Sequence, residues 1–519
     1  MICRIIVVIV LAVIGLIALI SGILSNQLIH AIIRKQLSQR LPLVNGSQTL
    51  PKWSNVRVPI YMKYHIFSIM NLNETLAGEQ PIFQEFGPYV FRQKVKKEIL
   101  GWNEDETLIT FKSRKTYFFE PTLSNGSLSD IVTIPNLPVI GMSTIAMEKT
   151  SFLTYYIAKG TVNTVIENSD AGPFVTLTVG ELLFEGKHSP FLSNVKSILD
   201  TVGLEMPIPP DGKFCLMRGK NHTADGNWTI YTGKSSLDEF GSVVKWSNLS
   251  YLSCWSGDDC NRIEGTDGMM FHPFVSNEES IKLFSSDVKR HDLFPFVTHQ
   301  FSMLSLSFTF EKNDVIEGID AYKFTIPDEV FSAPRFSERN KCFCVAPEKE
   351  GQLDVCAYNA MLDMHTSLNG APLVISLPHF YSSNESIINS TIGLKPSKEK
   401  HETFLKIDPV TGVVLSGAKR LQLNMHIRQD YGITILEKVK KGLYPIAWFE
   451  EGATMDAAIA GDLKSALHDK IALMKKVFLG VLISNLRKKE KNAQRNNYVY
   501  SNLKKTHDKE EIKNDHNRI

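Results

Sequence analysis

Residues 56–66 read VRVPIYMKYHI, and an apolar side chain stands at every even position. Because successive side chains of a β-strand point to opposite faces of its sheet, this alternation predicts a strand with one buried face. Residues 421–427 repeat the pattern, with polar residues between Leu421, Leu423, Met425 and Ile427. The turn sequence DPVTG at 408–412 separates LKI from VVL and predicts a hairpin. The chain is therefore expected to have a large β core.

Helical spacing of apolar residues is confined to a few stretches. It occurs in residues 141–160 and 189–203, and again in the amphipathic segment 455–474. No Gly/Ser-rich or Pro-rich linker divides the part between the two ends of the chain. We therefore expect one continuous α+β domain over residues 25–474.

The composition narrows the class of protein. Of the 519 residues 43% are hydrophobic and 22% are charged, and the formal net charge is only +2. These values exclude a disordered chain and a polybasic nucleic-acid binder, so no nucleic-acid partner is expected.

The N-terminus contains a candidate membrane span. Residues 5–24 read IIVVIVLAVIGLIALISGIL without a charge, and twenty helical residues reach about 30 Å, the thickness of the hydrocarbon core of a bilayer. We expect an uncleaved signal-anchor helix at 5–24 after a short cytosolic N-terminus at 1–4. A cleavable signal peptide is the alternative, although its apolar region is only about 7 to 15 residues long.

Two kinds of signal disagree on the orientation of this span. Arg34, Lys35 and Arg40 follow it, and the positive-inside rule alone would place residue 25 onward in the cytosol. Six of the seven cysteines lie between positions 215 and 356, and the chain has eight N-x-S/T sequons, which favour a luminal or extracellular location. The candidate glycosylation sites are Asn45, Asn73, Asn125, Asn221, Asn227, Asn248, Asn384 and Asn389.

The C-terminal end lacks a comparable span. Lys475 and Lys476 precede the apolar stretch VFLGVLIS at 477–484, and its eight residues reach only about 12 Å as a helix. Residues 485–519 contain ten basic and five acidic residues, which is typical of a solvated tail.

Signatures of catalysis are missing from the sequence. It contains no G-x-S-x-G elbow, no H-E-x-x-H pair and no C-x-x-C motif. We therefore expect no catalytic residue, no metal site and no cofactor.

The order of several short blocks points to a known family. The series begins with Trp53 and residues 58–71, and its later blocks extend to residue 424. In this order the chain resembles the class B scavenger receptor family, with similarity from about residue 5 to residue 475. The blocks are GEQP (78–81), EFGPYVF (85–91), YFFE (117–120), SLSD (127–130), PN (135–136), ELLF (181–184), CNRIEGTDG (260–268), CFC (342–344), LPHF (377–380), KHET (400–403) and KRLQLN (419–424).

The resemblance implies an α+β membrane-anchored ectodomain whose core is an antiparallel β-barrel with a lipid tunnel, and whose apical helical bundle spans about 140–200. It also implies that both termini are cytosolic, which resolves the conflict in orientation and places residues 25–474 outside. The expected function is non-enzymatic: a receptor that binds lipids, fatty acids, sterols or lipoprotein-like particles and transfers lipid through the tunnel. The rival is a sorting receptor for a luminal protein, and a hydrolase is the remote third choice. The expected location is the plasma membrane, with the lysosomal or endosomal membrane as the alternative.

The resemblance also implies individual roles for cysteines. By position in the family pattern, Cys260 pairs with Cys342 and Cys344 with Cys356, whereas a third family disulfide is missing at both ends, where Lys289 and Ser367 stand. We expect the remaining Cys215 and Cys254 to bridge each other, the alternative being two buried thiols. Cys3, at the inner membrane edge, is a candidate for S-acylation, with an unmodified thiol as the alternative.

Two further departures from the family pattern concern ligands and anchoring. Some relatives carry an apical lysine cluster before the ELLF block, where this chain reads ENSDAG at 167–172; Lys149, Lys159, Lys187 and Lys196 remain as candidate apical contacts. We therefore expect little capture of ligands by charge. Relatives have a second full span where this chain has the shortened segment 475–484, so we expect an internal deletion, and a single-pass protein is the alternative.

Overall fold

The computed structural model describes residues 27–491, with gaps at 149, 152, 202–207, 286–303, 345–352, 366–367, 369, 430, 481–482, 485–486 and 489–490. Its strands are β1 (Ile60–Ile69), β2 (Phe83–Trp102), β3 (Leu108–Phe119), β4 (Ile131–Pro135), β5 (Phe174–Thr178), β6 (Lys187–His188), β7 (Lys213–Phe214), β8 (Thr223–Tyr231), β9 (Val243–Trp246), β10 (Ile281–Ser285), β11 (Leu304–Ile316), β12 (Ile319–Thr325), β13 (Met361–Asp363), β14 (Leu373–Ser376), β15 (Phe404–Ile407), β16 (Val414–Ile427) and β17 (Gly442–Thr454). Its α-helices include α2 (Thr49–Ser54), α3 (Leu72–Leu76), α4 (Leu137–Glu148), α5 (Tyr155–Asn168), α6 (Pro190–Thr201), α7 (Asp258–Asn261), α8 (Glu385–Asn389), α9 (Lys398–His401) and α10 (Ala457–Leu463).

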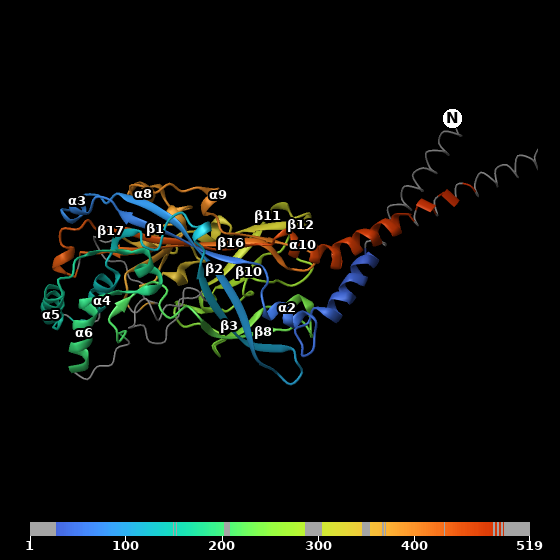
Figure 1. Ribbon diagram of the computed structural model, residues 1–519, viewed down its shortest axis with the longest axis horizontal. Coiled ribbons are helices and arrows are strands. Elements are labelled where there is room, and N and C mark those ends of the chain that lie inside the picture. The colour runs from blue at the N-terminus through green and yellow to red at the C-terminus, as the bar shows by residue number, and fades with distance from the viewer. Residues whose placement is uncertain are drawn as a thin grey trace, which may run out of the picture. The chain divides into compact units, whose positions relative to one another are not determined.

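One antiparallel sheet dominates the structure (Figure 1). In the described part of the chain thirteen strands belong to it, in the order β10-β11-β12-β15-β16-β17-β1-β2-β3-β8-β9, with β14 and β13 branching from β16. Strand β1 lies between β2 and the last strand, β17, and Ile60 is opposite Ala453. The first and last strands of the chain are therefore neighbours within the sheet.

A short segment connects the two ends of this strand order. Gly265 accepts a hydrogen bond from Val243 of β9 at 2.8 Å, while Thr266 donates to Lys282 of β10 at 3.0 Å and accepts from Phe284 at 2.9 Å, all through backbone atoms. The backbone groups of the two terminal strands are thus partly paired, and the sheet is nearly closed on itself.

Gly265 is required for this connection. Its φ is +98°, and a Cβ atom at this position would lie 2.2 Å from the carbonyl oxygen of Lys282. Gly265→Ala is therefore expected to lower the free energy of unfolding by about 2 kcal/mol or more, because neither the backbone conformation nor the neighbouring backbone tolerates a methyl group. Thermal or denaturant unfolding of the ectodomain checks this.

Gly46→Ala is the matched control for that measurement, because Gly46 has a φ of +76° but nothing within 4 Å of its added Cβ atom. It reports the cost of the positive φ alone. Equal losses of stability in the two variants would contradict the role of the close backbone contact.

The interior of the sheet is apolar around β10, β11, β12 and β15. Its core cluster includes Leu283, Leu306, Phe324 and Leu405, all less than one-tenth exposed. Burying side chains of this size contributes roughly 1.5 to 3 kcal/mol each. The packing of these side chains therefore holds the strands of this part of the sheet together.

Helices α4, α5 and α6 pack against one another. These helices come after β3 in the chain, and Figure 1 labels them and draws them in teal to green. The helical spacing predicted over residues 141–160 belongs to two helices, because α4 ends at Glu148 and α5 begins at Tyr155. Thr150 and Thr154 bond back to nearby carbonyl groups and form turns between the two helices.

The chain divides into two compact units. The sheet belongs to Leu41–Ala457, and Met1–Arg40 together with Ala458–Ile519 make up the other unit. In the described part of that second unit, residues 27–40 and the segment from α10 to residue 480 are helical. The domain boundaries expected at residues 24 and 475 stay predictions.

The predicted span at 5–24 and Cys3 lie outside the described residues, as does most of the tail at 485–519. None of the described helices is both long enough and apolar enough to cross a bilayer.

The structure confirms the α+β class and the large antiparallel sheet. Strand β1 has the alternating burial that residues 56–66 predict, and the hairpin at 408–412 connects β15 to β16. The interpretation of residues 421–427 as a strand with one solvated face is wrong, because Gln422 and Asn424 are fully buried. The segment after β14 covers that face, and Gln422 accepts a hydrogen bond from the His379 N–H.

Candidate functional site

A cavity of about 790 Å³ lies between β16 and the segments that carry the first disulfide. Residues 419–421 line it on one side, and residues 255–260 and 338–343 line it on the other. This volume is within the range of about 300 to 1,000 Å³ that is typical of sites for small organic ligands. The cavity is therefore the candidate functional site.

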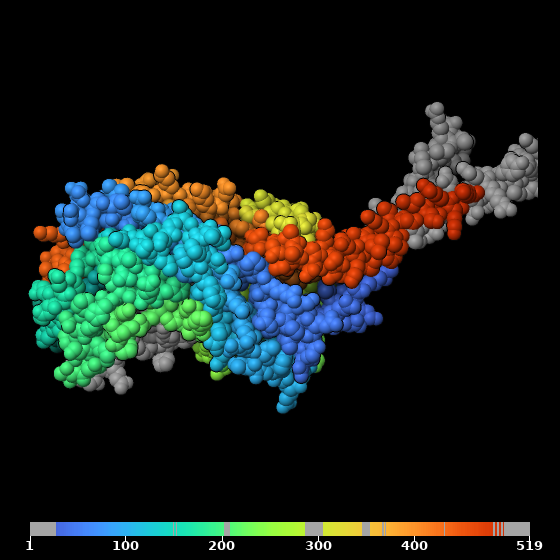
Figure 2. Space-filling view, viewed as in Figure 1, coloured from blue at the N-terminus to red at the C-terminus, as the bar shows by residue number. Residues whose placement is uncertain are grey.

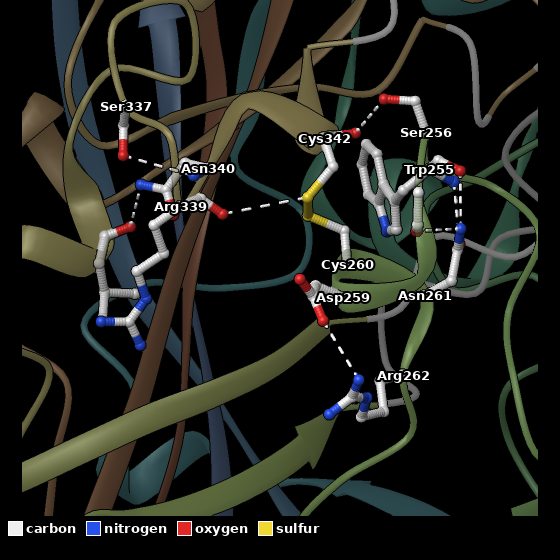
Figure 3. The surroundings of a disulfide bond; sticks show 12 residues. Trp255, Ser256, Asp259, Cys260, Asn261, Arg262, Ser337, Arg339, Asn340 and Cys342 are labelled. Atoms are coloured by element: carbon white, nitrogen blue, oxygen red, sulfur yellow. Dashed lines mark hydrogen bonds and ion pairs between the residues drawn. A yellow bond between two sulfur atoms is a disulfide. The ribbon is translucent and has the colours of Figure 1, made fainter.

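The wall formed by the disulfide-linked segments is held by hydrogen bonds (Figure 3). Cys260 and Cys342 are bonded, and the Ser256 hydroxyl donates to the carbonyl oxygen of Cys342 at 3.1 Å. The Asn261 side chain accepts from the Trp255 N–H at 3.0 Å and donates to its carbonyl at 2.7 Å. Because Asn261 satisfies the backbone of Trp255 on both sides, this segment keeps a defined shape without belonging to the sheet.

Apolar side chains make up a large part of the lining, and they come from several strands and from the segments between them. The flexible side chains of Met361 and Met364 can adapt to ligands of different shape. An apolar surface of this kind favours hydrocarbon over water. The apolar lining includes Leu306, Ile326, Met361, Met364, Ile375 and Leu421.

Charged side chains also line the cavity, and several of them are paired with each other. Arg262 lies 3.2 Å from Asp259 and 3.5 Å from Glu264, and Lys282 pairs with Glu264 as well. These pairs are partly solvated, so each contributes little to stability. They give the cavity a polar edge beside its apolar lining.

A polar cluster on the opposite face of the sheet fixes the covering segment that contains the LPHF block. Glu85 on β2 accepts from His65 at 2.5 Å and from the ring of His379 at 2.8 Å. Burial raises the pKa of Glu85, but the hydrogen bonds from the two histidines outweigh it and hold that pKa far below its usual range. Glu85 is therefore ionised at any physiological pH and ties His379 to the sheet.

The disulfides observed are Cys260–Cys342 and Cys344–Cys356, the two pairings that the resemblance implies. Cys215 and Cys254 are both buried, and the thiol of Cys215 is 3.4 Å from the carbonyl oxygen of Phe184. The bridge between Cys215 and Cys254 stays a prediction.

The sequon asparagines lie mostly at the surface. Asn227 is the exception, because it is half-buried within β8 and is paired with Lys112 of β3. Its glycosylation is therefore less accessible than that of the others, and all eight modifications stay predictions. The exposed ones are Asn45, Asn73, Asn125, Asn221, Asn248, Asn384 and Asn389.

The candidate apical lysines are distributed over separate elements. Lys187 on β6 donates to the carbonyl oxygen of Thr176, and Lys196 on α6 pairs with Asp200 at 2.9 Å. Lys159 is half-buried on α5, and Lys149 lies outside the described residues. Their role as ligand contacts stays a prediction.

Apart from Cys260 and Cys342, the residues that line the cavity were not predicted from the sequence as parts of a site. Lys419 appeared only as part of a family block, Leu421 only there and in the alternating pattern of a strand, and Met361 and Met364 carried no signal. One signal was available for Lys419, because it occupies the same alternating positions as the apolar residues Leu421 and Leu423 and therefore faces the interior.

The sequence profile described as the CD36 family matches residues 11–486. Scavenger receptor class B member 1 of Mus musculus is 29% identical over 467 residues, which cover 90% of this chain and 84% of the relative. Lysosome membrane protein 2 of Rattus norvegicus is 30% identical over 434 residues, or 83% of this chain and 82% of the relative. The human lysosome membrane protein 2 is 29% identical over 441 residues.

Proposed function

The chain belongs to the CD36 family, as the resemblance to class B scavenger receptors indicated, and on this premise we propose that it is a non-enzymatic membrane receptor. Its ligands are lipids or lipid-bearing particles, and it passes lipid through a tunnel in its ectodomain. The span at 5–24 anchors it, and the glycosylated ectodomain covers residues 25–474 with α4, α5 and α6 at its apex. The tail at 485–519 is cytosolic in a form that retains the second span, which is shortened here to 475–484. Its location is the plasma membrane, with the lysosomal or endosomal membrane as the alternative.

The cavity of about 790 Å³ carries this proposal. Leu306, Met361 and Ile375 give it an apolar wall, and Lys419 and Leu421 face it from inside the sheet. Each methylene group that leaves water for such a wall gains about 0.8 kcal/mol. A lipid chain is thus stable inside the ectodomain, which is what transfer between a particle and a membrane requires.

Mass spectrometry of lipid extracted from the purified ectodomain tests the proposal, and stoichiometric lipid is the expected result. Leu421→Trp narrows the cavity and should lower the lipid content severalfold. Leu123→Trp is the matched control, because Leu123 is 52% exposed and does not line the cavity. A folded ectodomain without lipid would contradict the proposal.

A sorting receptor for a luminal protein is the second candidate, and the surface near α5 favours it. Leu153, Tyr156 and Ile157 are 85%, 75% and 73% exposed, which is unusual for neighbouring apolar residues. This segment belongs to the green surface in Figure 2.

The substitution Ile157→Asp should then remove a protein that co-purifies with the ectodomain. Ile131→Asp, at another exposed apolar position, should not remove it. An empty ectodomain with such a partner would favour this function over lipid transfer.

Binding of lipid particles is expected to depend little on salt. Lys187 and Lys196 already interact with groups of this chain. Binding of a ligand therefore forms few new ion pairs with these lysines, and dissolved salt has few ion pairs to weaken. The affinity should change by less than about twofold between 0.05 and 0.5 M NaCl. Vesicle or particle binding measured over this range checks the expectation, and a steep loss of ligand would indicate capture by charge instead.

A further inference from the structure

The outer face of strands β2, β3, β8 and β9 is strongly basic. These strands are neighbours in the sheet (Figure 1), and on β2 the exposed Arg92, Lys94 and Lys96 alternate with buried residues. Arg114 of β3 lies opposite Lys96, and the register of β8 and β9 places Lys245 on the same face. Because alternate residues of a strand share a face, these side chains point away from the interior of the sheet. The charged members of this basic face are Arg92, Lys94, Lys96, Lys112, Arg114, Lys245, Glu98 and Glu120.

Only the arginines of the basic face are paired with its acidic groups. Arg92 lies 2.8 Å from Glu120, and Arg114 donates to both carboxylate oxygens of Glu98, at 2.8 and 3.1 Å. The ammonium groups of the four lysines make no hydrogen bond or ion pair with the described part of the chain. Six basic side chains thus stand beside two acidic ones, although the formal net charge of the whole chain is only +2. Positive charge is therefore concentrated on this face.

The lysines of the basic face do not hold the fold together. Lysine often protects the edge strands of a sheet, but β2 lies between β1 and β3 and has no free edge. Like charges directly opposite each other on neighbouring strands, as Lys96 and Arg114 are, destabilise a sheet. The basic face therefore lowers the stability of the free protein, and a bound polyanion would reverse this effect.

The compartment limits which polyanion can bind. The two disulfides indicate an oxidising compartment, which is separated from the nucleic acids of the cell. Anionic lipids are concentrated in the cytoplasmic leaflet of membranes, on the other side of the bilayer. Sulfated polysaccharides are abundant polyanions outside the cell, and the basic stretch RQKVKK at 92–97 is typical of surfaces that bind them. The flexible chain of such a polysaccharide can follow ammonium groups that are about 7 Å apart along β2.

We propose that the basic face binds a sulfated polysaccharide, whose sulfate groups contact Lys94, Lys96 and Lys112. This inference does not depend on lipid binding and uses only the extracellular or luminal location of the ectodomain. The contacts are exposed to solvent, so the affinity comes largely from the release of counterions and falls steeply with salt. Capture of lipid particles, by contrast, is expected to depend little on salt.

Binding of the full chain, in phosphatidylcholine nanodiscs, to immobilised heparin tests the proposal. With three ammonium groups in contact, the affinity should fall about tenfold between 0.05 and 0.15 M NaCl. Lys94→Gln together with Lys96→Gln should lower the affinity about tenfold at 0.05 M NaCl and remove about two-thirds of its salt dependence. Desulfated heparin, which keeps its carboxylates, should bind the unmodified chain at least about tenfold more weakly.

Lys395→Gln together with Lys400→Gln is the matched control, because both lysines are exposed outside the basic face and the net charge changes equally. This variant should bind heparin as the unmodified chain does. Thermal unfolding shows whether the variants are folded, and Lys96→Gln should not lower stability because it removes a like-charge pair. Equal losses of affinity in the two double variants would overturn the proposal, since net charge alone would then explain the binding.

The sequon at Asn227 calls for one more comparison, because Asn227 lies opposite Lys112 on the basic face. Asn227→Gln should leave the affinity for heparin unchanged. Binding that is found only in Asn227→Gln would show that a glycan covers the face, and it would overturn the proposal for the natural chain. Phosphatidylserine vesicles that bind through Lys94 and Lys96, without any binding of heparin, would also overturn it and identify a bilayer as the partner. The lipid content of the ectodomain is measured separately, so none of these outcomes decides the lipid-binding function.

Discussion

Lowering the pH from 7 to 5 is expected to reduce the free energy of unfolding of the ectodomain by roughly 4 kcal/mol. Two buried histidines, His401 and His426, account for about 2 kcal/mol each, as their pKa values of about 4 and about 3 imply against an ordinary value of 6.5. Few surface changes have an effect of this size.

The surroundings of His401 explain its low pKa. Burial is the main cause, and the neighbouring His379 and Arg420 add to it. The Nδ1 atom of His401 accepts a hydrogen bond from the Ser397 N–H at 3.0 Å, and its ring stacks on His379 with centroids 4.4 Å apart. A proton on Nδ1 would break the first contact, so the folded protein favours the neutral ring.

His426 is buried near the end of β16, and its pKa is lowered by burial first and then by Arg428 and His365. For both histidines the unfolded chain binds a proton more tightly than the folded protein does. Their neutral forms therefore stabilise the fold fully above about pH 6.5, and this contribution is lost progressively as the pH falls toward 4. Glu85 does not oppose this trend, because it stays ionised throughout the range.

Chemical denaturation between pH 7.5 and 4.5 measures the effect. His401→Asn keeps an acceptor for the Ser397 N–H but cannot be protonated, so it should remove about half of the pH dependence. His222→Asn, at an exposed position, is the control and should leave the dependence unchanged. A free energy of unfolding that is constant or rises between pH 7 and 5 would refute the prediction.

Replacing both Cys260 and Cys342 by alanine is expected to lower the free energy of unfolding by about 4.5 kcal/mol. The bond closes a loop with a sequence separation of 82 residues, and in the chain-entropy account long loops restrict the unfolded chain most. The same change at Cys344 and Cys356, with a separation of 12 residues, should cost only about 3 kcal/mol.

This variant should also lose lipid, because both cysteines line the large cavity. Denaturant unfolding and the lipid content are measured on the same preparation, with the Cys344–Cys356 variant as the comparison. A loss of stability that is equal in the two variants would show that loop length does not determine the effect. Full stability of the Cys260–Cys342 variant would show that Asn261 and its hydrogen bonds are sufficient to hold this wall.

Local patterns in the sequence predicted the elements better than their arrangement. Alternation identified β1, because its outer face carries polar residues such as Lys63. It did not predict the burial of Gln422 and Asn424, since the segment that contacts this face, around His379, is about forty residues away in the chain. Periodicity describes one element at a time, whereas burial depends on what packs against it.

The site was harder to predict for the same reason. Lys115, Lys419 and Glu451 are unremarkable charges in a linear sequence, and the ion pairs of Glu451 with the two lysines depend on the register of β3, β16 and β17. The disulfide pairings came from the resemblance to a family, because four cysteines alone allow several connections. The sequence did contain the alternation of side chains along each strand, which places these three charges on the inner face of the sheet.

The pairing of β1 with β17 has a consequence for biosynthesis. Ile60 cannot meet its partner Ala453 until about 390 further residues have been translated, which takes roughly 20 to 80 s at ordinary rates of synthesis. During that time one edge of β1 has no strand to pair with and remains open to chaperones or to other nascent chains. Ribosomes that stop before Gly442 would release chains in which both β1 and β16 lack their common neighbour. Only after synthesis of the last strand, β17, can quality control therefore distinguish a complete sheet from an incomplete one.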